Sequence, residues 1–488
     1  MDQVVDAVRG MRDVLPSEWR RQQQIAQQIQ QILHVHGYQA IDLPIVEHRE
    51  LYMRKLGEEL VGKIYEFEFS GRELVLRPEW TASVLRAYIA KMSDQVVPVR
   101  VQYTGPVFRY ERPQRGTWRQ FTQVGVEMIG APSPRADAEV LALACAGLQA
   151  VGISDVEIRL GHIGIIRQLL GSLGVSDRAR SVLTWSLERM RARGVAAVRE
   201  ALLSEFEGEG QGFDPALLAG LGDAQAEELL LHTLRSIGVN LQYGTRPAEE
   251  IVGRLVRTMR RDDRPETIER AINVLAELSA IHGPPARALA SLKELIAQYQ
   301  LADPGMADLE ALVALVPMHG LDLARITLDF GLGRGLHYYT GMMFEIADAT
   351  GLQLCGGGRY DELVSALGGR QPMPAVGFAY GLERVVLATP EPPPSTSPTG
   401  VAVIWEGADT YPYAVQVAQQ LRQHGISTVC DTRERSFAQQ LRDSERRGLQ
   451  VVVVTSADMA TQTVQWRSQR VNERMTLPEW LHRYGGQA

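Results

Sequence analysis

The stretch PEPPPSTSPTG, at residues 390–400, constrains the fold of this chain more than any other feature. Its density of Pro, Ser and Thr favours an extended, solvated linker. The chain must therefore fold as at least two units. In the second, of about ninety residues, the apolar runs 401–405, 426–430 and 451–455 alternate with helical patterns. This alternation predicts a small α/β domain with a mostly parallel sheet.

Before the linker, the pattern of apolar residues changes twice. Helices alternate with strands up to about residue 165, helical patterns dominate the next stretch, and strand character returns from Ile326 to Leu387. We interpret this as one core interrupted by a helical insertion. The predicted parts are the first part of the core at 1–165, the insertion at 166–320, the second part of the core at 321–388, the linker at 389–400 and the C-terminal domain at 401–488.

Composition limits the class of protein. With 45% apolar and 22% charged residues among 488, the chain reads as a globular protein of two to four domains. It has neither a membrane-spanning apolar run nor a secretion signal, so we expect a cytoplasmic protein without a membrane partner. Cys145, Cys355 and Cys430 lie far apart with no CxxC spacing, which favours reduced thiols and no metal site. The net charge of −7 gives no general attraction for nucleic acid.

Two strands, at about 99–111 and 121–130, are predicted on either side of the loop RPQRG. Side chains alternate in a strand, so Arg109 and Glu111 share one face of the first strand. In the second strand Gln123 and Glu127 share a face, and Gly125 between them leaves space for a small cationic ligand. The alternative is an ordinary antiparallel sheet with one solvated face.

Three further segments carry candidate ligand-binding residues. Glu79 and Thr81 lie at a strand-to-helix junction, where they could equally cap the helix. In DFGLGRGLHYYTG and GGGRYD, the glycines beside Arg334, Tyr338, Tyr339 and Tyr360 suggest backbone close to a ligand, or a Gly-rich hairpin with stacked tyrosines. The segment GLGRGL is not a dinucleotide fingerprint. Arg384, in AVGFAYGLERVV, follows an apolar strand and could also be a surface arginine.

The order of these motifs resembles the class II aminoacyl-tRNA synthetases. RGMRDVLP, RPE-x-T, RGL-x-YYTG and GGGRYD select the histidyl branch. The resemblance covers about residues 8–388, and the C-terminal unit is similar to that branch's anticodon-binding domain. It implies an α/β (α+β) fold: a class II synthetase-like antiparallel sheet core with a helical insertion, plus a small α/β anticodon-binding-like domain.

The resemblance also implies roles for individual residues. Arginine donates paired hydrogen bonds to phosphate, so Arg109 and Arg384, with Glu111 beside them, would form an ATP-type site. Arg334 would meet the α-phosphate and would be the catalytic residue of a ligase. The implied histidine-binding residues are Glu79, Thr81, Gln123, Glu127, Arg334, Tyr338, Tyr339 and Tyr360.

Several positions depart from the synthetase pattern. His337 stands where the family has an acid, Met342 replaces a threonine, and Trp80 fills a position where bacterial synthetases use glycine and could crowd the start of the helix. Thr122 replaces the histidine of FHQ, and the loop reads RGTWRQ. From Thr399 to Ala488 there are ten arginines, no lysines and nine acidic residues, whereas an RNA-reading surface normally has a basic excess.

These departures favour a non-catalytic paralogue. The chain resembles the regulatory subunit of ATP phosphoribosyltransferase, required for the first step of histidine biosynthesis, with histidine as effector and no tightly bound cofactor. Its partners would be the short-form catalytic subunit and a second copy in a homodimer core. Most such subunits lack a C-terminal domain, however. The alternative is a histidine–tRNA ligase that uses ATP with Mg²⁺ and tRNA(His).

Overall fold

The computed structural model describes residues 5–54, 62–207, 221–236, 252–253, 256, 265–333, 338–391, 400–467 and 472–484. The chain divides into two compact units, Met1–Pro390 and Glu391–Ala488, and each has its own hydrophobic core. No helix among the described residues is both long and apolar enough to cross a lipid bilayer.

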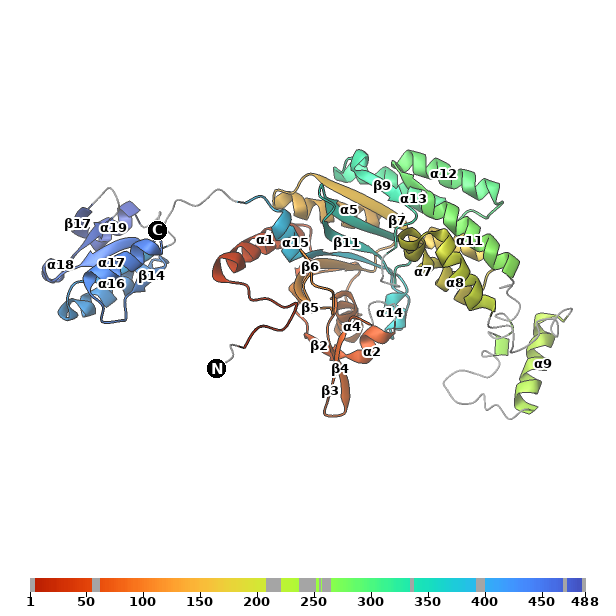
Figure 1. Cartoon of the computed structure of the whole chain (residues 1–488), viewed down its shortest axis with the longest axis horizontal. Coiled ribbons are helices and arrows are strands. Elements are labelled where there is room, and N and C mark those ends of the chain that lie inside the picture. The colour runs from red at the N-terminus through yellow and green to blue at the C-terminus, as the bar shows by residue number, and fades with distance from the viewer. Residues whose placement is uncertain are drawn as a thin grey trace. The chain divides into compact units, whose positions relative to one another are not determined.

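A nine-stranded sheet forms the centre of the larger unit (Figure 1). All neighbouring strands run antiparallel except the pairs β1–β5 and β7–β9. This largely antiparallel sheet confirms the predicted fold class. In spatial order the strands are β1 (Gln39–Ala40), β5 (Val99–Phe108), β6 (Gln120–Ile129), β12 (Ala375–Gly381), β11 (Gln353–Arg359), β10 (Met342–Asp348), β7 (Val156–His162), β9 (Ile326–Asp329) and β8 (His282–Gly283).

The main core lies between this sheet and helices α1 (Pro16–Val35), α5 (Arg135–Ala150) and α15 (Leu382–Ala388). In α1 the apolar side chains recur every four residues, at Ile25, Ile29 and Leu33, so they fall on one face and are buried. The strand β6 sends Val124, Val126 and Met128 into the same core. Its other face is therefore left to the polar side chains of the site.

A small three-stranded sheet of β2 (Val46–His48), β4 (Arg72–Leu76) and β3 (Tyr65–Phe69) lies beside the opposite face. Helix α2 (Arg49–Met53) packs against this small sheet and against α4 (Thr81–Lys91). A second hydrophobic cluster connects α4 to β5, to the tyrosines after residue 337 and to α14 (Leu363–Ala366). The start of α4 thus packs against the central sheet.

The residues between β7 and β9 are mostly helical, and Figure 1 shows α7, α8 and α11 side by side. These residues also supply β8 to the edge of the sheet, so the segment takes part in the core that it interrupts. The described helices are α6 (Ile163–Ser172), α7 (Asp177–Arg193), α8 (Val195–Glu207), α9 (Asp223–Ser236), α11 (Pro265–Ala280), α12 (Pro285–Gln298) and α13 (Met306–Leu315).

The C-terminal unit has a five-stranded sheet in the order β14 (Thr428–Cys430), β13 (Val401–Trp405), β15 (Gln450–Val454), β16 (Thr463–Arg467) and β17 (Asn472–Thr476). The first three strands are parallel and the last two are antiparallel. The prediction of a mostly parallel sheet is therefore correct for the three strands identified in the sequence, and the antiparallel hairpin of β16 and β17 makes the whole sheet mixed. The helices are α16 (Tyr411–Gln423), α17 (Phe437–Arg446), α18 (Ser456–Thr461) and α19 (Leu477–Tyr484).

Candidate functional site

A cleft of about 340 Å³ opens in the larger unit, on the polar face of β6 and its neighbouring strands. It collects side chains from segments separated by more than three hundred positions, from Lys63 to Arg384. Of the eleven residues predicted for the site, nine line it. Glu127 lies behind the wall, where it is bonded to three residues that line the cleft. Arg334 lies outside the described residues, as does His337. The nine are Glu79, Thr81, Arg109, Glu111, Gln123, Tyr338, Tyr339, Tyr360 and Arg384.

The Glu127 carboxylate accepts hydrogen bonds from three hydroxyl groups. Thr81 Oγ1 donates to Oε1 at 2.7 Å, Tyr103 donates to the same oxygen at 3.1 Å, and Tyr360 donates to Oε2. Glu127 is 1% exposed. Across the sheet it faces Gly377, where a Cβ atom would overlap its carboxylate. The glycine at 377 therefore makes room for this acid rather than only for a ligand.

Glu79 caps the helix that follows it. Its carboxylate accepts hydrogen bonds from the backbone N–H groups of Thr81 at 2.5 Å and Ala82 at 2.9 Å. The N-terminus of a helix favours such a negative charge. The helix-cap interpretation and the cleft-lining position are both correct for Glu79, because the cap holds the carboxylate at the wall of the cleft.

Gln123 brings an unsatisfied acceptor to the cleft. Its side chain is 9% exposed, and among the described residues its Oε1 atom has no hydrogen-bond partner. A buried acceptor without a partner costs free energy unless a ligand or water donates to it. An N–H group of a bound ligand would satisfy this atom.

The space above Gly125 is already filled. Tyr103 pairs with Gly125 across the two strands, and a Cβ at position 125 would lie 2.6 Å from the Tyr103 hydroxyl. The prediction that Gly125 leaves room for a ligand is therefore wrong. The glycine instead lets Tyr103 reach Glu127.

Three tyrosines form an aromatic wall. The ring centroids of Tyr338 and Tyr339 lie 5.0 Å apart, and Tyr338 meets Tyr360 edge-on at 5.6 Å. A Cβ at Gly358 would come within 2.7 Å of the Tyr339 ring, so the glycine run in β11 lets the strand approach the aromatic wall. All three side chains are at least 93% buried. Aromatic faces bordered by hydroxyl groups suit a flat, polar ring.

Two arginines line another part of the cleft. Arg384 donates from Nε to Gly116 O at 2.8 Å, from Nη1 to Gln353 O at 3.2 Å and from Nη2 to Thr117 Oγ1 at 3.1 Å. Arg109 donates to Pro78 O at 2.8 Å. Arg384 is thus half-buried and tied to the loop before β6, unlike an ordinary surface arginine. The first strand ends at Phe108, so strand alternation does not position Arg109 and Glu111 as we predicted.

The N-terminal segment holds the loop between β5 and β6. The backbone N–H of Arg119 donates to Gly10 O at 2.8 Å, and its guanidinium donates to Arg9 O at 3.0 Å. The Arg12 guanidinium lies 4.3 Å from the centre of the Trp118 ring, and Trp118 lines the cleft. This segment, Arg9–Arg12, is called the N-terminal strap below.

Burial acts on two acids of the site, Glu79 in the wall of the cleft and Glu127 behind it. It raises the pKa of Glu127 well above the usual range, and the neighbouring Glu79 raises it further against the hydroxyl donors. Burial also raises the pKa of Glu79. A cationic ligand would offset this desolvation, since an opposite charge favours the ionised carboxylate. The acids are therefore suited to binding a cation.

Some departures from the synthetase pattern leave the cleft intact. Thr122 uses its backbone N–H, which donates to both carboxylate oxygens of Glu383 at 2.9 and 3.0 Å, so the loss of a histidine side chain leaves this contact in place. Trp80 is fully buried and does not line the cleft. Met342 is buried in the main core.

Sequence reasoning missed several cleft residues. Tyr103 lies in the first predicted strand, and its place at the cleft follows from its pairing with Gly125. Glu345 and Gln353 come from β10 and β11. The place of β11 beside β12, and of β10 between β11 and β7, follows from long-range pairing that no local pattern reveals. Among the described residues, no three His, Cys, Asp or Glu side chains are arranged so that they could hold a metal ion.

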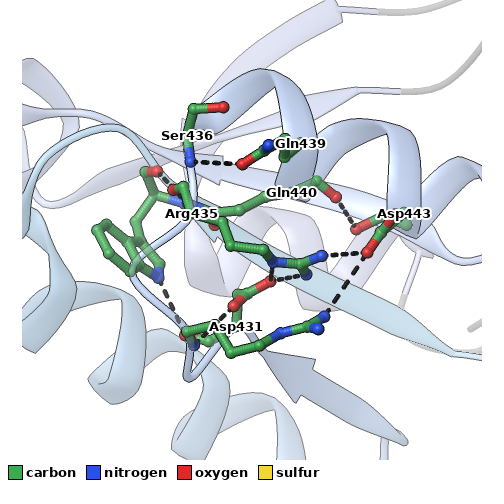
Figure 2. Close-up of polar contacts among 9 residues, drawn as sticks. Asp431, Arg435, Ser436, Gln439, Gln440 and Asp443 are labelled. Atoms are coloured by element: carbon green, nitrogen blue, oxygen red, sulfur yellow. Dashed lines mark hydrogen bonds and ion pairs between the residues drawn. The ribbon is translucent and has the colours of Figure 1, made fainter.

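The C-terminal unit has its own polar cluster (Figure 2). Arg435 is clamped between Asp431 and Asp443, and its hydrogen bond lowers the pKa of Asp443. Gln440 donates to the backbone oxygens of Trp405 and Arg435, each at 3.0 Å. This network fixes the loop after β14 against α17. A cleft of about 360 Å³ beside it is lined by both arginines and acids. The near-neutral charge balance of the C-terminal sequence therefore also holds at this cleft.

The chain was compared with known proteins. The family model described as histidyl-tRNA synthetase matches residues 10–226 and 251–385, and the model described as anticodon binding domain matches residues 400–482. A histidine–tRNA ligase of Synechococcus sp. (strain JA-3-3Ab) is 36% identical over 97% of each chain. One from Archaeoglobus fulgidus is 32% identical over 93% of this chain and 92% of its own.

Solved structures support the fold. The histidyl-tRNA synthetase of Nostoc sp. PCC 7120 matches with a TM-score of 0.64 at 22% identity, over 99% of this chain and all of its own. A Bacillus halodurans protein titled as an ATP phosphoribosyltransferase regulatory subunit/histidyl-tRNA synthetase also has a TM-score of 0.64 at 22% identity, over 93% of this chain and 99% of its own. At this identity both matches bear on the fold alone.

Proposed function

This chain belongs to the histidyl-tRNA synthetase family, and on that premise we propose that it is a histidine–tRNA ligase. The curated relatives named above are histidine–tRNA ligases. This evidence favours the alternative interpretation of the sequence over the regulatory one. The curated relatives give no support to the regulatory interpretation. We also propose that two copies of the chain form a homodimer.

The observation that carries the proposal is the coexistence of two kinds of wall in one cleft. One combines buried acids, the unsatisfied Gln123 acceptor and tyrosine rings. The other presents the guanidinium groups of Arg109 and Arg384. A histidine sensor needs only the first, whereas a ligase needs a phosphate-binding wall as well.

The first wall fits histidine by its chemistry. The tyrosines would lie against the imidazole ring, and Gln123 would accept a hydrogen bond from an N–H group of the ligand. Glu127, behind the wall, would hold the hydroxyl groups of Thr81, Tyr103 and Tyr360 in place. Glu79 lies in the same cleft and would attract the ammonium group. Ligands that lack this donor would leave the buried Gln123 acceptor unpaired, so they would be rejected strongly.

The second wall fits ATP. In the proposed first step, an oxygen of the histidine carboxylate attacks the α-phosphorus, the bond to the bridging oxygen breaks, and pyrophosphate leaves. Arg109 and Arg384 would hold the negative charge of the nucleotide, and Arg334 would meet the α-phosphate. Mg²⁺ would enter with ATP; it is usually held by one or two carboxylates together with phosphates, and Glu111 and Glu345 lie in the cleft near Arg384.

In the second step a ribose hydroxyl of the tRNA end attacks the carbonyl carbon of the adenylate, and AMP leaves. The experiment is to incubate the full-length protein with labelled histidine, ATP, Mg²⁺ and tRNA(His). We expect acid-precipitable histidyl-tRNA. An absence of charging, together with phosphoribosyl transfer that appears when a short catalytic subunit is added, would overturn the proposal in favour of the regulatory function.

A further inference from the structure

Trp80 occupies the first position before α4 and is fully buried, yet it does not contact the cleft. Its ring stacks on the ring of Tyr103, with centroids 4.8 Å apart and planes 9° from parallel. Tyr103 does line the cleft, and its hydroxyl donates to Glu127 Oε1. Trp80 is therefore one residue removed from Glu127, the acid that bonds the hydroxyl groups of the cleft wall.

A contact with Arg77 also holds the Trp80 indole in place. The Arg77 guanidinium carbon lies 3.5 Å from the centre of the Trp80 ring, and Arg77 is 1% exposed. Arg77 in turn donates to Pro106 O at 2.9 Å and Leu43 O at 2.8 Å. A cation over an aromatic face is favourable, and more so when it is desolvated. Arg77 thus fixes the stack at its Trp80 end, and the Tyr103 end lines the cleft.

Gly105 makes this stack possible. A Cβ at position 105 would lie 2.7 Å from Trp80 Cζ2 and 2.8 Å from Arg77 Nη2. The Gly105 carbonyl also accepts a hydrogen bond from Trp80 Nε1 at 3.3 Å. The indole is therefore oriented by a polar contact as well as by packing.

We propose that Trp80 is a positioning residue for histidine binding, which acts through Tyr103 on Glu127. The stack fixes the plane of the Tyr103 ring and so keeps its hydroxyl on Glu127 Oε1. With Thr81 and Tyr360, this contact selects one orientation of the carboxylate. The inference rests on the proposed function, since it names the residue that orders the proposed histidine-binding wall.

The competing explanation is that Trp80 only fills the core. Replacing a buried aromatic residue would then lower stability, but it would have no particular effect on histidine. If Trp80 is a positioning residue, its replacement weakens the binding of histidine but not of ATP, and it does so only when the Tyr103 hydroxyl is present. If Trp80 only fills the core, neither difference is expected.

The test measures the histidine dissociation constant by calorimetry for the full-length protein and for Trp80→Phe, Tyr103→Phe and the double variant. We expect Trp80→Phe to weaken binding about five- to tenfold and Tyr103→Phe about tenfold or more. The double variant should match Tyr103→Phe within about twofold, because the two residues act in series. The KM for ATP should stay within about twofold throughout. Trp480→Phe, a buried tryptophan of the C-terminal unit, is the matched control and should change neither value.

A second variant keeps the test informative if Trp80→Phe does not fold. Gly105→Ala leaves both rings in the chain but pushes on the indole, so it should also weaken histidine binding, and only when Tyr103 is present. Additive effects in the double variant, equal losses for histidine and ATP, or unchanged histidine binding would each overturn the inference.

These outcomes are separable from a failure of the proposed function. If the wild-type protein binds histidine but does not form histidyl-tRNA, the ligase proposal fails while the dissociation constants still decide the role of Trp80. If the wild-type protein binds no histidine, both fail.

Discussion

Arg359 donates from Nε to Oδ1 of Asp137 at 2.7 Å, which joins residues 222 positions apart inside the core. Their side chains are 3% and 0% exposed. Arg359 also donates to Ala131 O at 3.1 Å and Asp361 Oδ1 at 2.8 Å. The ion pair ties the end of β11 to α5, and the next residue after Arg359 is Tyr360 of the aromatic wall.

Removing this arginine should destabilise the larger unit. Arg359→Met leaves the Asp137 charge buried without its partner, which costs about 3–5 kcal/mol. Thermal and denaturant unfolding of the full-length protein would measure this loss. The control is Arg167→Met, which breaks an ion pair with Glu362 whose side chains are 38% and 51% exposed; there we expect less than about 1 kcal/mol. Similar losses in both variants would contradict the importance of the buried pair.

His162 makes stability depend on pH. Its Nδ1 accepts a hydrogen bond from Ile165 N at 3.2 Å and so caps α6, and burial lowers the pKa of His162 from 6.5 to about 4. Between these values the unfolded chain binds more protons, so stability falls as the pH falls from about 6.5 toward 4. His162→Asn keeps a capping oxygen that does not titrate in this range.

We therefore expect the His162→Asn variant to lose roughly 2 kcal/mol less than the wild type between pH 7 and about pH 4.5. Unfolding curves across this range would measure the difference. The exposed His319→Asn should follow the wild-type curve. If His162→Asn follows it as well, His162 is not the group responsible.

The N-terminal strap should act on ATP use through the loop between β5 and β6. Gly10 has φ +86°, and a Cβ there would lie 2.6 Å from Arg119 Cδ. Gly37 has the same φ of +86° with nothing within 4 Å of its added Cβ. Both Gly→Ala variants carry the same backbone strain, about 1–2 kcal/mol. Only Gly10→Ala should raise the KM for ATP, by about fivefold or more. Equal kinetics for the two variants would show that the strap does not order the loop.

Arg384 should serve the nucleotide rather than the amino acid. Lysine cannot reproduce the three directions in which the guanidinium donates, so Arg384→Lys should raise the KM for ATP about tenfold or more. The dissociation constant for histidine should stay within about twofold. Arg422→Lys is the control, because Arg422 donates to Thr428 O in the C-terminal unit. Loss of histidine affinity equal to the loss for ATP would argue against this assignment.

Local patterns predicted the parts of the site that depend on local structure. Alternation along β6 correctly separated Val124 and Val126, in the core, from Gln123, in the cleft, and Glu127, directly behind its wall, because strand parity is a local property. The helix cap by Glu79 was likewise predicted from its place at a strand-to-helix junction.

Tertiary neighbours were not readable in the same way. The space above Gly125 depends on its pairing with Tyr103, and the space above Gly377 depends on its pairing with Glu127. Registers of this kind follow from the whole sheet. Trp80 was predicted to crowd the start of the helix, but the glycine at 105 on β5 gives the indole a place behind Tyr103.

The most direct test of the central claim is ATP–pyrophosphate exchange by the full-length protein with each of the standard amino acids in turn. Exchange requires the acidic, aromatic wall to bind histidine while the arginine wall binds ATP in the same cleft. We predict exchange with histidine alone, and its loss in Glu127→Gln. Exchange that depends on a different amino acid, or none with any, would contradict the account.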